Sequence, residues 1–326
     1  MLKVGKLDSD LLKKIVFDKI TFRRDEVITR PEIGEDCAVI DYGDYECVLS
    51  TDPITASIED IGKLAVHISC NDIASNGVEP VGLLLAVLLP EGTTEEDIEH
   101  MMEQAGRASE ELGVEIVGGH TEITRAVNQP VMISTAIGRG PKGGSQTGED
   151  MVPGDLLIVT KQVGLEGTGI IATEKDMTGI LTEEEKAEAV SMLEKVSVVK
   201  EGVIAGAVGT HGMHDVTEGG ILGGVWEMCY VSGLGAEIDK ESIPVSDITL
   251  KLAEAIDIDW MRLISSGCML IVMEEAKWPE LQMKLAAAGV DSACIGRVTE
   301  KEEGVRFTDG TPIDPPGPDE IYKAVD

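Results

Sequence analysis

Residues 60–80 read DIGKLAVHISCNDIASNGVEP, and no other stretch of the chain says more about its fold. The pattern predicts a helix over 60–75, with Gly77 as its end. Asn71 and Asp72 interrupt an otherwise apolar run, although both compete with the helix for backbone hydrogen bonds. A helix end would explain Gly77, but not two adjacent polar groups on a buried stretch. Because buried carboxylates are normally paired or bound to metal, we predict that Asn71 and Asp72 contact a metal ion or a substrate.

Four other short stretches place a carboxylate beside glycine or a small polar residue. They are GEDCAV (34–39), STDP (50–53), GGHTEIT (118–124) and MHDVTEGG (213–220). Taken singly, each is typical of a turn aspartate, a structural histidine or a helix cap. Together with Asp72, they predict a polyanion held through divalent cations, because carboxylate oxygens are the ligands that Mg²⁺ requires.

The composition excludes several classes of protein. The 326 residues carry a net charge of −33, which argues against a nucleic-acid partner because phosphate binding needs a basic surface. No apolar run reaches about 18 residues, so we expect no membrane segment. The six cysteines show no CxxC spacing, which favours reduced thiols over a zinc or disulfide framework. We therefore expect a cytoplasmic protein.

The pattern of elements predicts two α/β (α+β) domains, divided in the Gly- and Pro-rich stretch 138–155 into 1–145 and 146–326. Regular strand–helix alternation is missing, so a doubly wound sheet is not expected. Helices are predicted over 8–21, 60–75, 94–112, 182–208 and 216–231. Strands are predicted over 37–40, 46–50, 81–89, 114–118, 131–138, 156–161, 268–273 and 293–298.

Two glycine-rich motifs are candidates for anion binding. GLEGTGI (164–170) is a turn running into a helix, and its backbone N–H groups are suited to phosphate. HGMHDVTEGG (211–220) allows either a zinc site of His211, His214 and Asp215 or a helix N-terminus facing an anion. The segment GRGPKG (138–143) matches GxGxxG only formally, since Pro141 occupies the turn and no helix follows. The chain has no P-loop motif.

The motifs together resemble the AIR synthase (PurM)-like superfamily of ATP-binding proteins, which includes thiamine-monophosphate kinase, selenophosphate synthetase and the hydrogenase maturation factor HypE. The most specific match is residues 60–80, whose spacing is closest to that of HypE. GEDCAV, STDP, GGHTE, GDLLIVTKQVGLEGTGIIA (154–172), HDVTEGG and SSGCMLI (265–271) match in consistent order.

The resemblance implies a two-domain fold whose N-terminal domain contributes a mixed sheet to a homodimer, with ATP and Mg²⁺ in a cleft. It implies that the metal ligands are Asp36, Asp52, Asp72 and Asp215. The implied nucleotide contacts are Asn71, Thr121, Gly164, Gly167, Thr217 and Gly219. The implied catalytic groups are His120 and Glu122.

The implied activity is ATP-dependent activation of an amide- or carbonyl-type oxygen by phosphoryl transfer. The resemblance to HypE implies a role in hydrogenase maturation, together with a maturation partner protein. HypE ends in the cysteine that is modified, whereas this chain ends YKAVD and has its last cysteine at Cys294. Two alternatives therefore stay open, namely a nucleotide-binding scaffold without catalysis and a small-molecule kinase resembling thiamine-monophosphate kinase.

Overall fold

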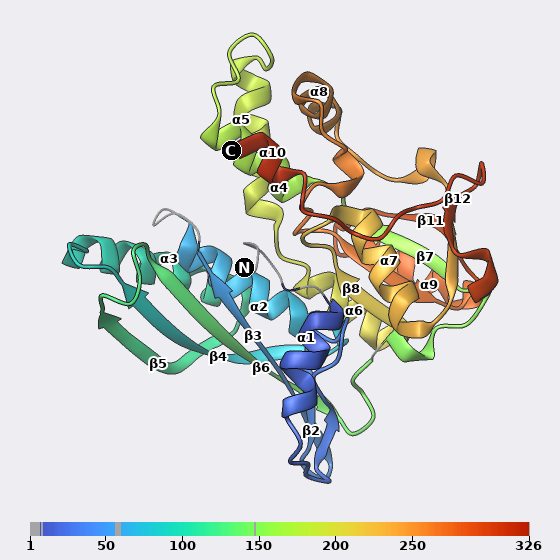
Figure 1. Ribbon diagram of the computed structural model, residues 1–326, viewed down its shortest axis with the longest axis horizontal. Helices are drawn as coiled ribbons and strands as arrows, with labels where there is room; N and C mark the ends of the chain where they lie inside the picture. The colour runs from blue at the N-terminus through green and yellow to red at the C-terminus, as the bar shows by residue number, and fades with distance from the viewer. Residues whose placement is uncertain (1–6, 8, 56–59, 147, 326) are drawn as a thin grey trace.

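The computed structural model describes residues 7, 9–55, 60–146 and 148–325. It contains two six-stranded sheets, one from each half of the chain, with helices packed between and around them (Figure 1). The α/β class and the two-part architecture predicted from the sequence are confirmed. The first sheet ends at Pro141 and the second begins at Leu156. The division at 145/146 falls between them and stays a prediction.

The first sheet has the order β1-β2-β3-β6-β4-β5, in which only β4 and β5 pair in parallel. One face carries helices and supplies the first core, and the other face is only partly covered. In β6, for example, the side chains of Met132, Ser134 and Ala136 are buried while their neighbours are half-exposed. The strands are β1 (Val27–Thr29), β2 (Ala38–Asp41), β3 (Tyr45–Ile54), β4 (Glu79–Leu89), β5 (Glu115–Ile123) and β6 (Val131–Pro141).

The helices of the first half are α1 (Ser9–Ile15), the short 3₁₀ turn η1 (Phe17–Lys19), α2 (Ile61–Ser75) and α3 (Glu95–Leu112). Thr94 and Asp97 form the capping box that begins α3, and Gly113 ends it in a left-handed conformation, as the sequence predicts. The predicted helix over 8–21 is the shorter α1 followed by η1, and residue 8 lies outside the described residues.

The second sheet has the order β12-β9-β11-β7-β10-β8, in which β12 and β9 pair in parallel. β7 and β10 are buried along their whole length because both of their faces are covered. Its strands are β7 (Leu156–Thr160), β8 (Gly212–Asp215), β9 (Gly235–Ile238), β10 (Met269–Met273), β11 (Ser292–Thr299) and β12 (Val305–Phe307). Its helices are α4 (Leu165–Glu174), α5 (Glu183–Ser191), α6 (Val199–Val208), α7 (Gly220–Ser232), α8 (Asp247–Ile256), α9 (Trp278–Ala287) and α10 (Ile321–Val325). Short 3₁₀ turns lie between elements, namely η2 (Gly148–Asp150), η3 (Met192–Lys195), η4 (Lys240–Ser242), η5 (Trp260–Arg262), η6 (Glu275–Lys277) and η7 (Lys301–Glu303).

Helix α2 connects the two halves. It packs on α3 and the first sheet on one side, and against α6 and β8 on the other. The approach is close where Gly202 of α6 meets the carbonyl of Ala74, which leaves no room for a Cβ atom. One continuous core contains α2 residues together with Leu156, Ile158 and Ile271 of the second sheet. The helix predicted from residues 60–80 therefore forms the junction of the molecule.

Two predicted helices differ from the structure. The predicted helix over 182–208 is divided into α5, η3 (Met192–Lys195) and α6, because residues 196–198 leave the helical path to bond with other parts of the fold. The predicted helix over 216–231 begins only at Gly220, because the residues before it form strand β8 and a turn. The sequence patterns also missed β1, β8, β9, β12, α8, α9 and α10. No helix within the described ranges has the length and hydrophobicity needed to cross a bilayer.

Candidate active site at the domain junction

Asp72 lies on α2 with only 6 % of its surface exposed. Its carboxylate accepts a hydrogen bond of 2.5 Å from the hydroxyl of Ser50 on β3, and its backbone carbonyl accepts one from the thiol of Cys37. A helix-interior carboxylate is thus bonded to strand β3, which carries the STDP motif, and lies beside the GEDCAV segment that leads into β2. Burial raises the pKa of Asp72 well above its usual range, as do the negative charge of Asp215 and a hydrogen bond with Asp52.

Asp215 reaches the same region from the second sheet. It is the last residue of β8, it is 2 % exposed, and its Oδ1 accepts a hydrogen bond of 3.0 Å from Ser75 of α2. Its Oδ2 is buried and has no hydrogen-bond partner in the described part of the chain. Burial and the nearby charge of Asp36 raise the pKa of Asp215 to about 6. Carboxylates from both halves of the molecule therefore converge on one point and repel one another.

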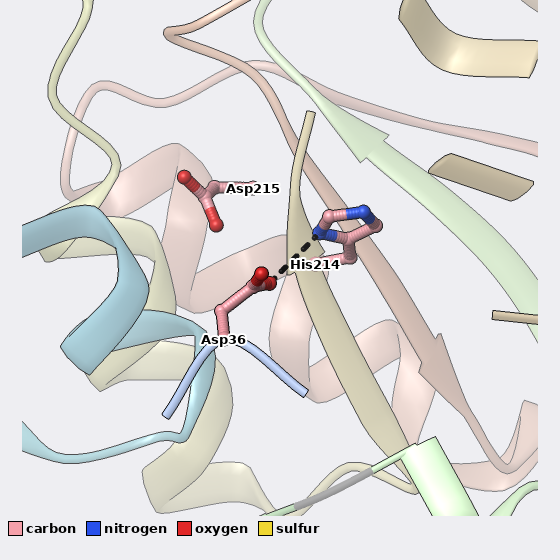
Figure 2. Close-up of side chains that lie close together, drawn as sticks. All are labelled: Asp36, His214 and Asp215. Atoms are coloured by element: carbon pink, nitrogen blue, oxygen red, sulfur yellow. Dashed lines mark ion pairs between the residues drawn. The ribbon is translucent and has the colours of Figure 1, made fainter. Parts of the chain in front are cut away.

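Asp36 and His214 complete the group (Figure 2). One ligand atom from each of Asp36, His214 and Asp215 lies within 4.8 Å of the other two. The Nδ1 of His214 is 3.8 Å from Oδ2 of Asp36, while its Nε2 lies 3.0 Å from Oε2 of Glu227 on α7. Burial lowers the pKa of His214, but the bond with Glu227 and the charge of Asp36 outweigh it and raise this pKa to about 9.

This arrangement fits divalent cations. Four aspartates surround a junction where the Oδ2 of Asp215 has no partner, and bringing their charges together is unfavourable without a counter-ion. Carboxylate oxygens are the preferred ligands of Mg²⁺, which in proteins is typically shared with the phosphates of a bound substrate. Asp36, Asp52, Asp72 and Asp215 are thus brought together as the sequence motifs predict.

Asn71, which the resemblance implies as a nucleotide contact, has its side-chain amide bonded within the protein. It is fully buried, its amide donates to the carbonyl of Val196, and its side-chain oxygen accepts from the N–H of Val198. Both ends of the amide are therefore used within the protein. Asn71 holds the turn between η3 and α6 against α2, and this explains why the predicted long helix breaks there.

The predicted phosphate-binding glycines also have internal partners. The N–H of Gly164 donates to Ser265 Oγ, and the N–H of Gly167 donates to the carbonyl of Ile264. The N–H of Gly219 donates to the carboxylate of Asp319 at 2.7 Å. In this structure these N–H groups are not available to phosphate, and the three glycines instead serve the packing of α4 and α7. Thr217 lies in the half-buried turn between β8 and α7.

His120, Thr121 and Glu122 lie apart from the acidic group. They belong to β5, which is the exposed edge of the first sheet, whereas Asp52 lies on β3 with β6 and β4 between the two strands. The Nε2 of His120 is 3.2 Å from Oε2 of Glu122, and both side chains are exposed. Within one chain, the structure does not bring these three residues to the site.

The zinc site predicted from His211, His214 and Asp215 is wrong for one of its three ligands, His211. His211 pairs with Asp155 at 2.8 Å and does not belong to the group of three that could hold a metal, in which Asp36 takes its place. Sequence reasoning also missed Ser50, Ser75 and Glu227. Ser50 and Ser75 lie inside the quoted motifs, and Ser75 follows Asn71 by one helical turn, so helical spacing was a usable signal for it.

Comparison with known proteins identifies both halves of the chain with one family. Residues 34–139 match the family described as AIR synthase related protein, N-terminal domain, and residues 152–309 match its C-terminal domain. A putative hydrogenase expression/formation protein of Methanocaldococcus jannaschii is 27 % identical over 310 residues, covering 92 % of this chain and 90 % of that protein. The carbamoyl dehydratase HypE of Rhizobium leguminosarum bv. viciae is 30 % identical over 249 residues, covering 73 % and 68 % respectively.

Solved structures share the fold. That of a HypE–HypF complex superimposes with a TM-score of 0.74 at 23 % identity, covering 94 % of this chain and 99 % of that one. That of the hydrogenase maturation protein HypE in complex with ATP gives 0.69 at 21 % identity, covering 94 % of each chain. With both domains matched in order and the acidic motifs gathered at their junction, this chain belongs to the AIR synthase related protein family.

Proposed function

We propose that this protein is an ATP- and Mg²⁺-dependent enzyme that dehydrates a carbamoyl group, as the name carbamoyl dehydratase describes for its HypE relatives. The observation that carries the proposal is the meeting of Asp72 and Asp215, which come from different domains, with Ser75 bonded to one of them. Divalent cations would neutralise this acidic group, and the same ions would bind the phosphates of a nucleoside triphosphate. The ATP complex of a HypE structure with the same fold supports this choice of ligand.

The proposed chemistry follows from an amide acceptor. The carbamoyl oxygen attacks the γ-phosphorus of ATP, a C–O–P bond forms, and ADP leaves. Phosphate then departs with the carbamoyl oxygen, the nitrogen loses its two protons to bases, and a nitrile remains. Asp36, Asp52, Asp72 and Asp215 hold the divalent ions, which neutralise charge on the transferred phosphoryl group when bound. We also propose a cytoplasmic location, where ATP is supplied.

His120 and Glu122, as the proposed catalytic groups, and Thr121, as a nucleotide contact, must come from a second copy of the chain, since β5 lies at the far edge of their own sheet. The helix-free face of that sheet offers a surface for such a homodimer. Val81, Leu84 and Val117 are each at least 40 % exposed on β4 and β5. We also propose a maturation partner that supplies the carbamoyl group, in line with the HypE–HypF complex.

The test uses the purified protein, Mg²⁺-ATP and a peptide carrying an S-carbamoylcysteine. Product formation is followed as ADP release together with loss of one water from the peptide by mass spectrometry. We expect one ADP for each nitrile, and no reaction in excess chelator. ADP release without dehydration of the peptide, for a range of carbamoyl donors, would contradict the dehydratase assignment.

A further inference from the structure

His214 contributes a nitrogen to an otherwise all-oxygen group. Its Nδ1 faces Asp36, and together with one oxygen each of Asp36 and Asp215 it forms the set of three donors within 4.8 Å (Figure 2). Donors bound to one ion at about 2.0–2.2 Å lie roughly 3–4 Å apart, so small rotations close this set around a cation. Asp36 has the freedom for this movement, because 47 % of its side chain is exposed.

The imidazole is held in place from the opposite side. Its Nε2 meets the carboxylate of Glu227 at 3.0 Å, and its Cδ2 edge lies against α7 at Gly224, where an added Cβ would come within 3.4 Å. Histidines that bind a metal through one ring nitrogen usually donate the N–H of the other nitrogen to a carboxylate or carbonyl, which fixes the orientation of the ring. Glu227 therefore fixes which nitrogen faces the acidic group.

A second, independent feature points to a ligand at this place. The Oδ2 of Asp215 is buried without a hydrogen-bond partner in the described residues, although Asp215 as a whole is only 2 % exposed. An orphaned carboxylate oxygen is unfavourable in a protein interior unless a cation or donor reaches it. A metal ion shared with His214 and Asp36 would satisfy it.

We propose that Asp36, His214 and Asp215 form a mixed nitrogen–oxygen site that prefers a first-row transition ion such as Mn²⁺ to Mg²⁺, with Glu227 positioning the imidazole. Imidazole suits transition ions, whereas Mg²⁺ favours oxygen ligands alone. This inference deepens the proposed function, since it concerns one metal of the same site. It does not depend on the identity of the acceptor.

The experiment uses the full-length, metal-free protein and Mn²⁺ alone, without ATP or acceptor. Bound Mn²⁺ is counted by the loss of the free-ion electron paramagnetic resonance signal, and a directly bound nitrogen is detected as ¹⁴N modulation in pulsed spectra. We expect ¹⁴N modulation and at least about tenfold tighter binding of Mn²⁺ than of Mg²⁺. His214→Gln should abolish the modulation and weaken Mn²⁺ binding by about tenfold or more, with little effect on Mg²⁺.

Two variants sharpen the result. His211→Gln is the matched control, because His211 pairs with Asp155 outside the site and its loss should leave Mn²⁺ binding and the ¹⁴N signal unchanged. Glu227→Gln should weaken Mn²⁺ binding by about 10–100-fold, as outer-shell substitutions do. Absence of ¹⁴N modulation in the wild-type protein, or equal Mn²⁺ affinity in His214→Gln, overturns the proposal. Neither outcome decides the proposed function, which is tested separately by the Mg²⁺-ATP turnover assay.

Discussion

The hydroxyl of Ser75 donates a 3.0 Å hydrogen bond to Oδ1 of Asp215. This bond joins helix α2, in the first half of the molecule, to the last residue of strand β8, in the second half. This bond couples the fold to the site, because it connects helix α2 to a buried carboxylate of the other half of the molecule. It also places Asp215 beside the helix that carries Asp72.

Ser75→Ala should destabilise the metal-free protein by about 1.5–3 kcal/mol at pH 8, where Asp215 is ionised, because a buried charged acceptor loses its donor. Near pH 5 Asp215 is mostly protonated and the cost should be smaller. Urea unfolding at both pH values measures this. Ser69→Ala is the control on the same helix, since Ser69 bonds only a neutral carbonyl at 3.4 Å. An equal decrease in the free energy of unfolding for both variants would show that the Ser75–Asp215 bond contributes no more than a bond to a neutral carbonyl.

Asn71→Ala should act on stability more than on ligand binding. Its loss leaves the carbonyl of Val196 and the N–H of Val198 without partners, at about 1–3 kcal/mol for each buried group. Asn76→Ala is the comparison, because the buried side-chain oxygen of Asn76 has no hydrogen-bond partner among the described residues. We expect the larger decrease in unfolding free energy for Asn71→Ala. If that variant instead folds normally and loses only ATP affinity, Asn71 is a nucleotide contact.

Glu166, in the first turn of α4, gives the chain a pH-dependent stability. Burial of the carboxyl group raises its pKa from 4.5 to about 6. Its contribution is therefore complete below about pH 4.5 and is lost as the pH rises through 6. The free energy of unfolding of Glu166→Gln should be larger than that of the wild type by up to about 2 kcal/mol at pH 8. At pH 4.5 the two free energies of unfolding should differ little. Denaturant unfolding of metal-free protein measures both. A constant difference across this range would mean that Glu166 does not titrate there.

Complementation tests whether His120 serves the site of a second copy. Asp72→Asn and His120→Ala should each be inactive as homodimers. In a mixed dimer, one site would combine the intact Asp72 of one chain with the intact His120 of the other and recover activity. Differently tagged chains, co-expressed and purified through both tags, supply the mixed dimer for the ADP-release assay. No recovery would place His120 outside the reaction or in its own chain's site.

The local parts of the fold are readable from the sequence, because their causes lie within a few residues. The helix over residues 60–75 and the cap at Thr94 are of this kind. The break at 196–198 is not, since its cause is Asn71, more than a hundred residues away in sequence. The same distinction between local and distant causes explains which parts of the site could be predicted. Motif spacing identifies Asp36, Asp72 and Asp215 as candidates, but only the fold reveals that the Gly164 N–H is used by Ser265 and that Asp36 replaces His211.

The central claim is that the acidic group at the domain junction binds Mg²⁺-ATP, and calorimetric titration of ATP into wild-type protein and Asp72→Asn tests it most directly. Asp44→Asn is the control, because Asp44 is an exposed turn residue just before β3. We predict binding to the wild type and to Asp44→Asn only when a divalent ion is present, and at least about tenfold weaker binding to Asp72→Asn. ATP binding that is equal in all three proteins, or that persists unchanged in excess chelator, would contradict the account.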